Sequence, residues 1–227
     1  MADIVEALAG PLVPLIHPAQ GVTGLARAVR GWRLSLTGGS TVEAAAVIFA
    51  LPAWTTARLV VAAGAPGGRH LDDVVYHPSL TVSLAYRAEQ LAATPAGTGF
   101  VAAGEWSGAV RACSYSSLKY PHRAPAGHVL LRAFLSPVDG DPTTLAHTEL
   151  ASILRIKGVP LWSRVFAWSR GLPRYRPGHA QHVAAVRHEL LRLPPLAIAG
   201  AGLDGAGVSA CVRSGREAAK TVITRLG

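Results

Sequence analysis

The strongest structural signal in the sequence is Leu196-Ala-Ile-Ala-Gly200-Ala-Gly202-Leu-Asp204-Gly205-Ala-Gly207-Val208. Its first four residues are apolar and predict a buried strand, which runs into a glycine-rich turn that opens a helix. A turn of this kind points backbone N–H groups and the positive end of a helix at an anionic ligand. Gly200, Gly202 and Gly205 also spell G-x-G-x-x-G.

These glycines do not indicate the first step of a complete dinucleotide-binding fold. Such a fold needs a second strand after the helix, with an acidic residue about 20 positions further on. The sequence ends at Gly227 before either could follow. We therefore expect the turn to close a nucleotide site whose opening half lies elsewhere.

Composition favours a globular protein with part of its surface covered. The 227 residues suit one or two domains, half of them are hydrophobic, and only 15% are charged. The 22 Lys and Arg residues exceed the 13 Asp and Glu residues, which gives a net charge of +9. A coding bias toward arginine, an anionic ligand or an acidic membrane surface would each explain this excess. Because basic blocks are absent and aromatic residues are few, nucleic acid is not an expected partner.

The two cysteines and the N-terminus bear on location. Cys113 and Cys211 form neither a disulfide framework nor a C-x-x-C pair, which is typical of a reducing compartment. Asp3 and Glu6 stand where a signal peptide would carry basic residues. The uncharged run 44–57 is too short to span a bilayer. These features predict a cytoplasmic protein and leave peripheral membrane contact open.

The order of the expected elements predicts a split domain of mixed α/β class. The segment 42–51 reads as one strand with an apolar, buried end, and it resembles 196–199 in this respect. We expect the two segments to share one α/β layer, interrupted by an antiparallel sheet. The strands expected in that sheet are Leu80–Arg87, Gly99–Ala103, Ala109–Tyr115 and His128–Leu135.

The last helix is predicted to pack on the α/β layer through one apolar stripe. The residues of that stripe are Val208, Cys211, Val212, Gly215, Ala219 and Val222.

Several separated motifs resemble those of one family, in order and spacing. The family is that of the FAD-dependent protoporphyrinogen/coproporphyrinogen oxidases, within the flavin amine oxidases, and the likeness covers about 20–225. The motifs are His77-Pro-Ser-Leu-Thr-Val-Ser-Leu-Ala-Tyr86, Ala112-Cys-Ser-Tyr-Ser-Ser-Leu-Lys-Tyr-Pro121, Arg123-Ala-Pro-Ala-Gly-His-Val-Leu-Leu-Arg-Ala-Phe134, Trp168-Ser-Arg-Gly-Leu-Pro-Arg-Tyr-Arg-Pro-Gly-His179 and the glycine-rich closing segment.

The resemblance implies the C-terminal half of such an enzyme. Its expected parts are 1–63 and 166–227, which belong to an FAD-binding, Rossmann-like domain, and 64–165, a substrate-binding antiparallel sheet. The implied reaction belongs to haem biosynthesis and oxidises coproporphyrinogen III or protoporphyrinogen IX to the porphyrin, with O₂ as acceptor. The N-terminal G-x-G-x-x-G that grips the FAD diphosphate has no counterpart, so a missing N-terminal half is the expected partner.

The resemblance also assigns binding residues, each with a plainer structural explanation. A valine in a strand, a tryptophan in a core and a glycine-rich helix start would look the same without a ligand. Because the flavin carries the chemistry, no catalytic side chain is expected. The cofactor-binding residues are Val22, Trp168, Ala206, Gly207 and Val208, and the substrate-binding residues are Gly99, Phe100, Val101 and Phe134.

Other interpretations stay open or are set aside. Arg132 or Arg111 could meet a substrate carboxylate, although neither belongs to a motif. His179 and His182 share a helix face, but no Cys or carboxylate completes a metal-ligand set. The alternatives to an oxidase are a non-catalytic remnant that serves as an interaction module, and a fragment of another flavin amine oxidase-like enzyme.

Overall fold

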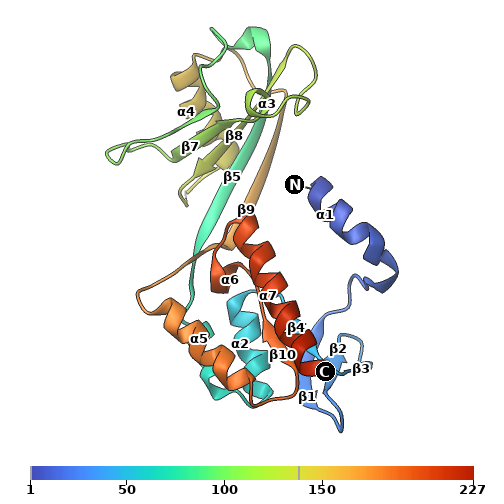
Figure 1. The fold of residues 1–227 in the computed structure, drawn as a ribbon. Coiled ribbons are helices and arrows are strands. Elements are labelled where there is room, and N and C mark those ends of the chain that lie inside the picture. Colours follow the sequence, from blue (N-terminus) through green and yellow to red (C-terminus); the bar gives the residue numbers. More distant parts are fainter. Residues whose placement is uncertain (1, 138) are drawn as a thin grey trace. The chain divides into compact units, whose positions relative to one another are not determined.

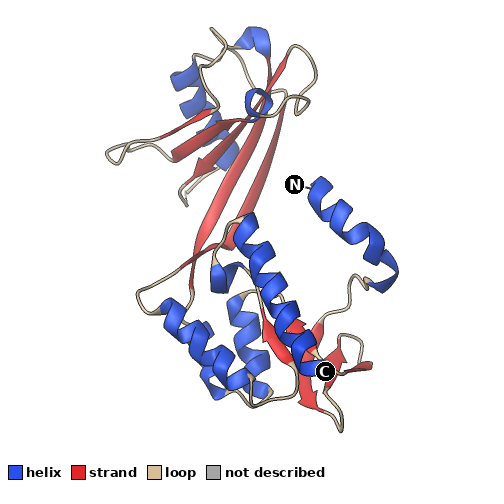
Figure 2. Cartoon of the chain, in the orientation of Figure 1, coloured by secondary structure: helices blue, strands red, loops and turns tan. Residues whose placement is uncertain are grey.

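The chain forms two compact units. The structure, a computed structural model, describes residues 2–137 and 139–227. Figure 1 gives the elements in sequence order, and Figure 2 shows that helices dominate one unit whereas long strands run through the other.

The boundaries between the two units are those of the contacts that residues make within each unit. One unit contains Met1–Val75 and Arg174–Gly227, and the other contains Tyr76–Pro173. Both boundaries come later in the chain than those expected at 63/64 and 165/166. The assignment of the first and last segments to one FAD-binding domain stays a prediction.

A parallel strand pair forms the centre of the first unit. β4 (Val47–Phe49) pairs with β10 (Leu196–Ile198), and Val47 lies opposite Leu196. Every residue of β10 is buried, which explains why its sequence is apolar without alternation. The pairing joins the two segments that the sequence assigned to one layer.

The prediction of a single strand over 42–51 is wrong. The chain bends at Ala45-Ala46, and β3 (Thr41–Ala44) belongs to a different sheet from β4. β1 (Val22–Arg27), β2 (Trp32–Leu36) and β3 form an antiparallel sheet of three strands. The segment therefore pairs first with β2 and then with β10, and a hydrophobic pattern alone does not show this change of partner.

Trp32 ties this small sheet to the parallel pair. Its side chain is fully buried, and its Nε1 donates to the carbonyl oxygen of Pro195 at 3.1 Å, one residue before β10. Helix α1 (Ala2–Ala9) and the 3₁₀ turn η1 (Gly10–Leu15) precede β1.

Helices cover the parallel pair. α5 (His179–Leu190) and α7 (Val208–Leu226) contact β10, while α2 (Ala53–Ala62) and α5 both pack on the 3₁₀ segment η2 (Pro66–Leu71). Glu189 in α5 fixes the start of η2, because its Oε2 accepts from the backbone N–H of Gly67 at 2.8 Å.

The apolar stripe predicted for α7 is wrong at its N-terminal end. The buried residues of α7 are Ser214, Ala218 and Val222, whereas Val208 and Val212 are 47% and 48% exposed. Only Val222 of the predicted stripe is fully buried. The helix is turned because the hydroxyl of Ser214 reaches the glycine-rich turn beneath it, where it is hydrogen-bonded.

The second unit is built on a five-stranded sheet, as the sequence predicted for an inserted antiparallel sheet. The strand order is β6-β7-β8-β5-β9, and β6–β7, β7–β8 and β8–β5 are antiparallel pairs. The strands are β5 (Val75–Arg87), β6 (Gly99–Val101), β7 (Val110–Tyr115), β8 (His128–Leu135) and β9 (Trp162–Arg174).

One face of this sheet is covered by α4 (Pro142–Leu154), which contacts β7 and β8. Asp141 caps the helix, since its Oδ2 accepts from the backbone N–H of Thr144 at 2.8 Å. The core between helix and sheet includes Val82, Leu84, Tyr86, Leu131 and Leu150. Two short elements complete the unit: η3 (Ala88–Gln90) and α3 (Ser116–Lys119).

Candidate functional site

The glycine-rich turn presents the N-terminus of α7 to solvent. Gly200 and Gly205, at φ +129° and +125°, flank the short helix α6 (Ala201–Asp204). Gly207 is the N-cap residue of α7, and Ala206, Gly207 and Val208 are exposed. The first N–H groups of a helix have no partner within it, and they mark the positive end of its dipole. The three predicted cofactor residues in this turn thus form an exposed, electropositive tip.

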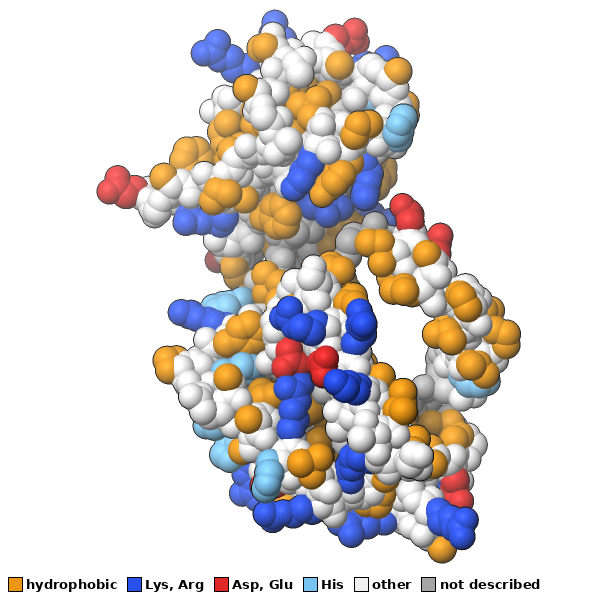
Figure 3. Space-filling view, viewed as in Figure 1, with side chains coloured by type: hydrophobic (Ala, Val, Ile, Leu, Met, Phe, Trp, Pro, Cys, Tyr) orange, Lys and Arg blue, Asp and Glu red, His pale blue; other side chains and the backbone are white. Residues whose placement is uncertain are grey.

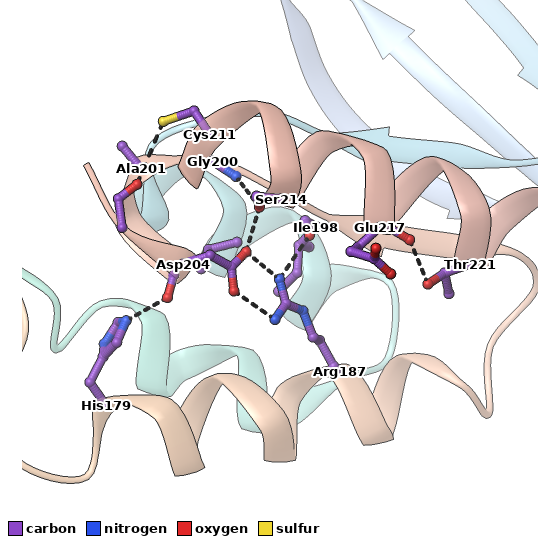
Figure 4. Close-up of polar contacts among 12 residues, drawn as sticks. His179, Arg187, Ile198, Gly200, Ala201, Asp204, Cys211, Ser214, Glu217 and Thr221 are labelled. Atoms are coloured by element: carbon purple, nitrogen blue, oxygen red, sulfur yellow. Dashed lines mark hydrogen bonds and ion pairs between the residues drawn. The ribbon is translucent and has the colours of Figure 1, made fainter. Parts of the chain in front are cut away.

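Asp204 fixes both ends of the turn. Its carboxylate accepts two hydrogen bonds from Arg187 in α5, at 2.9 Å from Nη1 and 2.6 Å from Nη2. It accepts a third from the hydroxyl of Ser214, and that hydroxyl accepts from the backbone N–H of Gly200 at 3.0 Å. Figure 4 shows how these groups converge beneath the start of α7. The turn is therefore held in one conformation by side chains from α5 and α7.

The same contacts set the ionisation of Asp204. Burial opposes the charged form, but the hydrogen bonds from Arg187 and Ser214 outweigh burial, and the charges of Arg187 and Arg213 add to them. The pKa of Asp204 consequently lies below its ordinary value.

Two rings brace the turn, one from Tyr175 before α5 and one from His179, the first residue of α5. The Tyr175 hydroxyl donates to the carbonyl oxygen of Ala201, and His179 Nε2 donates to that of Leu203 at 2.9 Å. The rings of Tyr175 and His179 lie 4.7 Å apart. The end of the motif that runs from Trp168 to His179 thus contacts the glycine-rich turn through backbone carbonyls.

The geometry suits an anionic, planar cofactor at the tip. A Cβ on Gly207 would meet nothing within 4 Å, so the space in front of the tip is open. Arg213 and Arg216 are exposed in the second and third turns of α7. Figure 3 shows Lys and Arg side chains gathered over the face on which α7 lies. These features fit the flavin part of FAD, although they supply no loop that would grip its diphosphate.

A cavity of about 930 Å³ lies in the first unit, lined by α5, α6, β10 and α7. Its walls include Val183, Leu190, Leu196 and Ile198 beside Arg187. In the part of the chain that the structure describes, β10 pairs with β4 alone, which leaves its other edge without a strand. An unpaired edge in a parallel sheet exposes backbone groups that a further strand would satisfy.

The other two predicted cofactor residues lie away from the turn in the sequence. Val22 begins β1, where it is half-buried and pairs with Leu36. Trp168 lies on β9 in the second unit and is 62% exposed, so it is not a core residue. Their cofactor contacts stay predictions.

The predicted substrate residues divide between the two faces of the sheet. Gly99, Val101 and Phe134 share one face through the pairs Gly99–Ser114, Val101–Ala112 and Ala112–Phe134. Phe100 points the other way and packs on the core, with its ring 6.4 Å from that of Tyr115. Side chains alternate along a strand, so Phe100 cannot share a wall with its two neighbours.

The histidines have local roles. His179 braces the turn, and His182 stacks on His70 with ring centroids 5.0 Å apart. Within residues 2–137 and 139–227, no three His, Cys, Asp or Glu side chains converge as a metal site.

Sequence reasoning missed Arg187 and Ser214. A lone serine on an otherwise small and apolar helix face was the available signal. Nothing in the sequence pairs Arg187 with Asp204.

None of the helices in the described part of the chain combines the length and the apolar composition that a membrane span requires. The predicted cytoplasmic location and peripheral membrane contact stay predictions.

Comparison with known proteins gives consistent matches. The family described as "Flavin containing amine oxidoreductase" matches residues 1–223. Coproporphyrinogen III oxidase of Bacillus subtilis (strain 168) is 27% identical over 93% of this chain and 47% of its own length. The Mycobacterium bovis enzyme of the same name is 34% identical, over 87% and 44%. Human protoporphyrinogen oxidase is 30% identical, over 90% and 46%.

A solved structure agrees with these relatives. A crystal structure from Exiguobacterium sp. 255-15, assigned provisionally as a protoporphyrinogen oxidase, superposes with a TM-score of 0.79 at 25% identity. The match covers 96% of this chain and 50% of the other. The chain thus spans about half the length of the relatives that it matches.

Proposed function

Because the chain belongs to the flavin-containing amine oxidoreductase family, we propose that it forms the C-terminal part of an FAD-dependent porphyrinogen oxidase. The reaction would convert coproporphyrinogen III or protoporphyrinogen IX to the porphyrin in haem biosynthesis, with O₂ as acceptor. Relatives with these two substrates in their names match the chain at about 30% identity, which supports the substrate class without choosing between them.

The observation that carries the proposal is the exposed tip at Ala206, Gly207 and Val208. It is held by Asp204 beneath the first turns of α7, and no described residue would come within 4 Å of a Cβ built on Gly207. The chemistry that bound FAD would supply is two-electron oxidation. The role of the tip would be to stabilise negative charge placed against it, which is worth roughly 0.3–2 kcal/mol at a helix terminus.

The diphosphate loop of FAD would come from sequence outside residues 1–227. The chain spans about half of its relatives, and among the described residues no strand pairs with the second edge of β10, which lies beside a mostly apolar cavity. We propose that this edge accepts a strand of the complementary half of the FAD domain. Residues 1–227 alone should therefore bind FAD weakly or not at all.

An absorbance titration tests the cofactor part of the proposal. Purified residues 1–227 are expected to show little or no flavin spectrum with added FAD, and to gain one when co-expressed with a polypeptide that carries the diphosphate loop. Flavin that co-purifies with the isolated chain at near one per molecule would contradict the proposal that the diphosphate-binding loop lies outside residues 1–227.

Aerobic formation of porphyrin fluorescence tests the reaction. Coproporphyrinogen III and protoporphyrinogen IX are each incubated with the flavin-loaded complex, with FAD alone as the blank for spontaneous oxidation. A rate well above the blank with either substrate supports the proposal. Equal rates with and without protein would favour a non-catalytic interaction module instead.

A further inference from the structure

The five-stranded sheet has one face covered by α4, and its opposite face carries several small side chains around Arg132. Residues directly opposite on paired strands place their side chains on the same face. The pairs Phe100–Cys113, Cys113–Ala133 and Val82–Ala133 lie on the core side. The residues between them therefore point to the opposite, open face.

Arg132 stands in the middle of that open face. It lies opposite Ser83 on β5 and opposite Ser114 on β7, and Ser114 in turn lies opposite Gly99 on β6. Ser83 is buried, whereas Arg132 and Gly99 are exposed, so the open part of this face lies toward β7 and β6. The cross-strand row thus reads Gly99, Ser114, Arg132, Ser83, with one cation among residues that have small or no side chains.

Gly99 explains why the sheet surface has no side chain at the β6 end of this row. At φ +152°, a Cβ on Gly99 would lie 2.2 Å from the carbonyl oxygen of Cys113, so a larger residue does not fit. The next row contains Val101, Ala112, Phe134 and Thr81, of which Val101 is 83% and Phe134 37% exposed.

The guanidinium of Arg132 is not engaged. Neither row contains an acidic residue, and among the described residues no hydrogen bond or ion pair is found for the Arg132 side chain. Arg111, on the neighbouring strand, differs because its Nη1 donates to the carbonyl oxygen of Trp106 at 2.8 Å. The guanidinium of Arg132 is planar and can donate two parallel hydrogen bonds to a carboxylate. The exposed ring of Phe134, two residues along the same strand, would suit an apolar ring system that carries such a carboxylate.

We propose that Arg132 binds a carboxylate side chain of the tetrapyrrole, with the macrocycle lying over the low rows of the open sheet face against Phe134. This inference rests on the proposed porphyrinogen oxidase function, and it names the residue of the sheet that recognises the anionic edge of the substrate. Arg132 would act as a specificity-determining residue and would take no part in the oxidation itself.

Fluorescence titration of the flavin-loaded complex with coproporphyrin III tests the proposal. Arg132→Met removes the fork of donors and should weaken binding about tenfold, the scale of one charge-assisted contact at an exposed site. Arg132→Lys should recover part of the loss, since it restores the charge without the fork. Arg111→Met is the matched control and should bind within about twofold of the wild type.

The tetramethyl ester of coproporphyrin III separates recognition of charge from packing. The ester should bind the wild type as weakly as Arg132→Met binds the free acid, and the variant should lose nothing further. Equal affinities of wild type and Arg132→Met for the free acid would overturn the role of Arg132 and leave the proposed function standing. If the wild-type complex binds neither porphyrin, the proposed function and this inference fail together.

Discussion

Replacement of Asp204 by Asn should release the glycine-rich turn while keeping the shape of the side chain. In the wild type the carboxylate accepts from both terminal nitrogens of Arg187 and from Ser214. An amide presents one acceptor oxygen and turns an NH₂ group toward the donors of Arg187. At least one of the three contacts is therefore lost, and the guanidinium loses its counter-charge.

The magnitude follows from the exposure of the pair. A hydrogen bond to a charged group contributes about 1.5–3 kcal/mol. The side chain of Arg187 is 41% exposed and that of Asp204 24% exposed, so water replaces part of what is lost. We expect the free energy of opening this region to fall by about 2 kcal/mol, a roughly thirtyfold change in the opening equilibrium.

Amide hydrogen exchange across 196–208 measures this opening locally, which avoids treating two units as one transition. Glu217→Gln is the matched control, because Glu217 is an exposed carboxylate on the same helix that forms no ion pair among the described residues. The control should change exchange protection by less than about 0.5 kcal/mol.

The pH dependence supplies the refutation. The pKa of Asp204 is lower in the folded state than its ordinary value of 3.8, so its contribution is present above that value and is lost as pH falls through the folded pKa. The difference between wild type and Asp204→Asn should shrink as pH falls below about 4. A difference that does not depend on pH, or one no larger than that of Glu217→Gln, would show that the ion pair does not hold the turn.

Three further predictions concern the tip, the cysteines and the sheet. Ala206→Asp should weaken FAD binding in the complete protein at least tenfold without destabilising α7, since a helix start favours negative charge, whereas the same change at Thr224 near the opposite end should leave FAD affinity unaltered. Burial raises the pKa of the Cys113 thiol to about 12, so a thiol reagent at pH 8 should label only Cys211 until denaturant is added; prompt labelling of both would contradict the buried placement. Gly99→Ala should lower the melting temperature of the second unit by several degrees, because its Cβ would collide with a backbone oxygen, and an unchanged melting curve would exclude the close strand approach.

Local pattern was sufficient to predict the closing segment. An apolar run, a cluster of glycines and a long amphipathic stretch predict strand, turn and helix over 196–226, and β10, α6 and α7 are found there. Alternating strands between turn signals likewise predicted the antiparallel sheet. These features depend on backbone preferences and side-chain periods within a few residues, which is information that the sequence carries directly.

Three features of the candidate site depended on contacts between distant residues. The bend at Ala45-Ala46, the rotation of α7 onto Ser214, and the pairing of Arg187 with Asp204 each involve a partner elsewhere in the chain. Hydrophobicity at Val208 and Val212 predicted burial, but the hydrogen bonds of Ser214 decided which side of the helix faces inward.

Sequence pattern alone was enough to predict the class of elements and the family to which the chain belongs. The cofactor role of Gly207 stays a prediction. Long-range strand pairing was needed to show that Phe100 faces the core, while Arg132 lies on the opposite face between two serines. Strand register is the physical reason, because a shift of one residue exchanges the two faces, and register is fixed by pairing between segments that the sequence does not align.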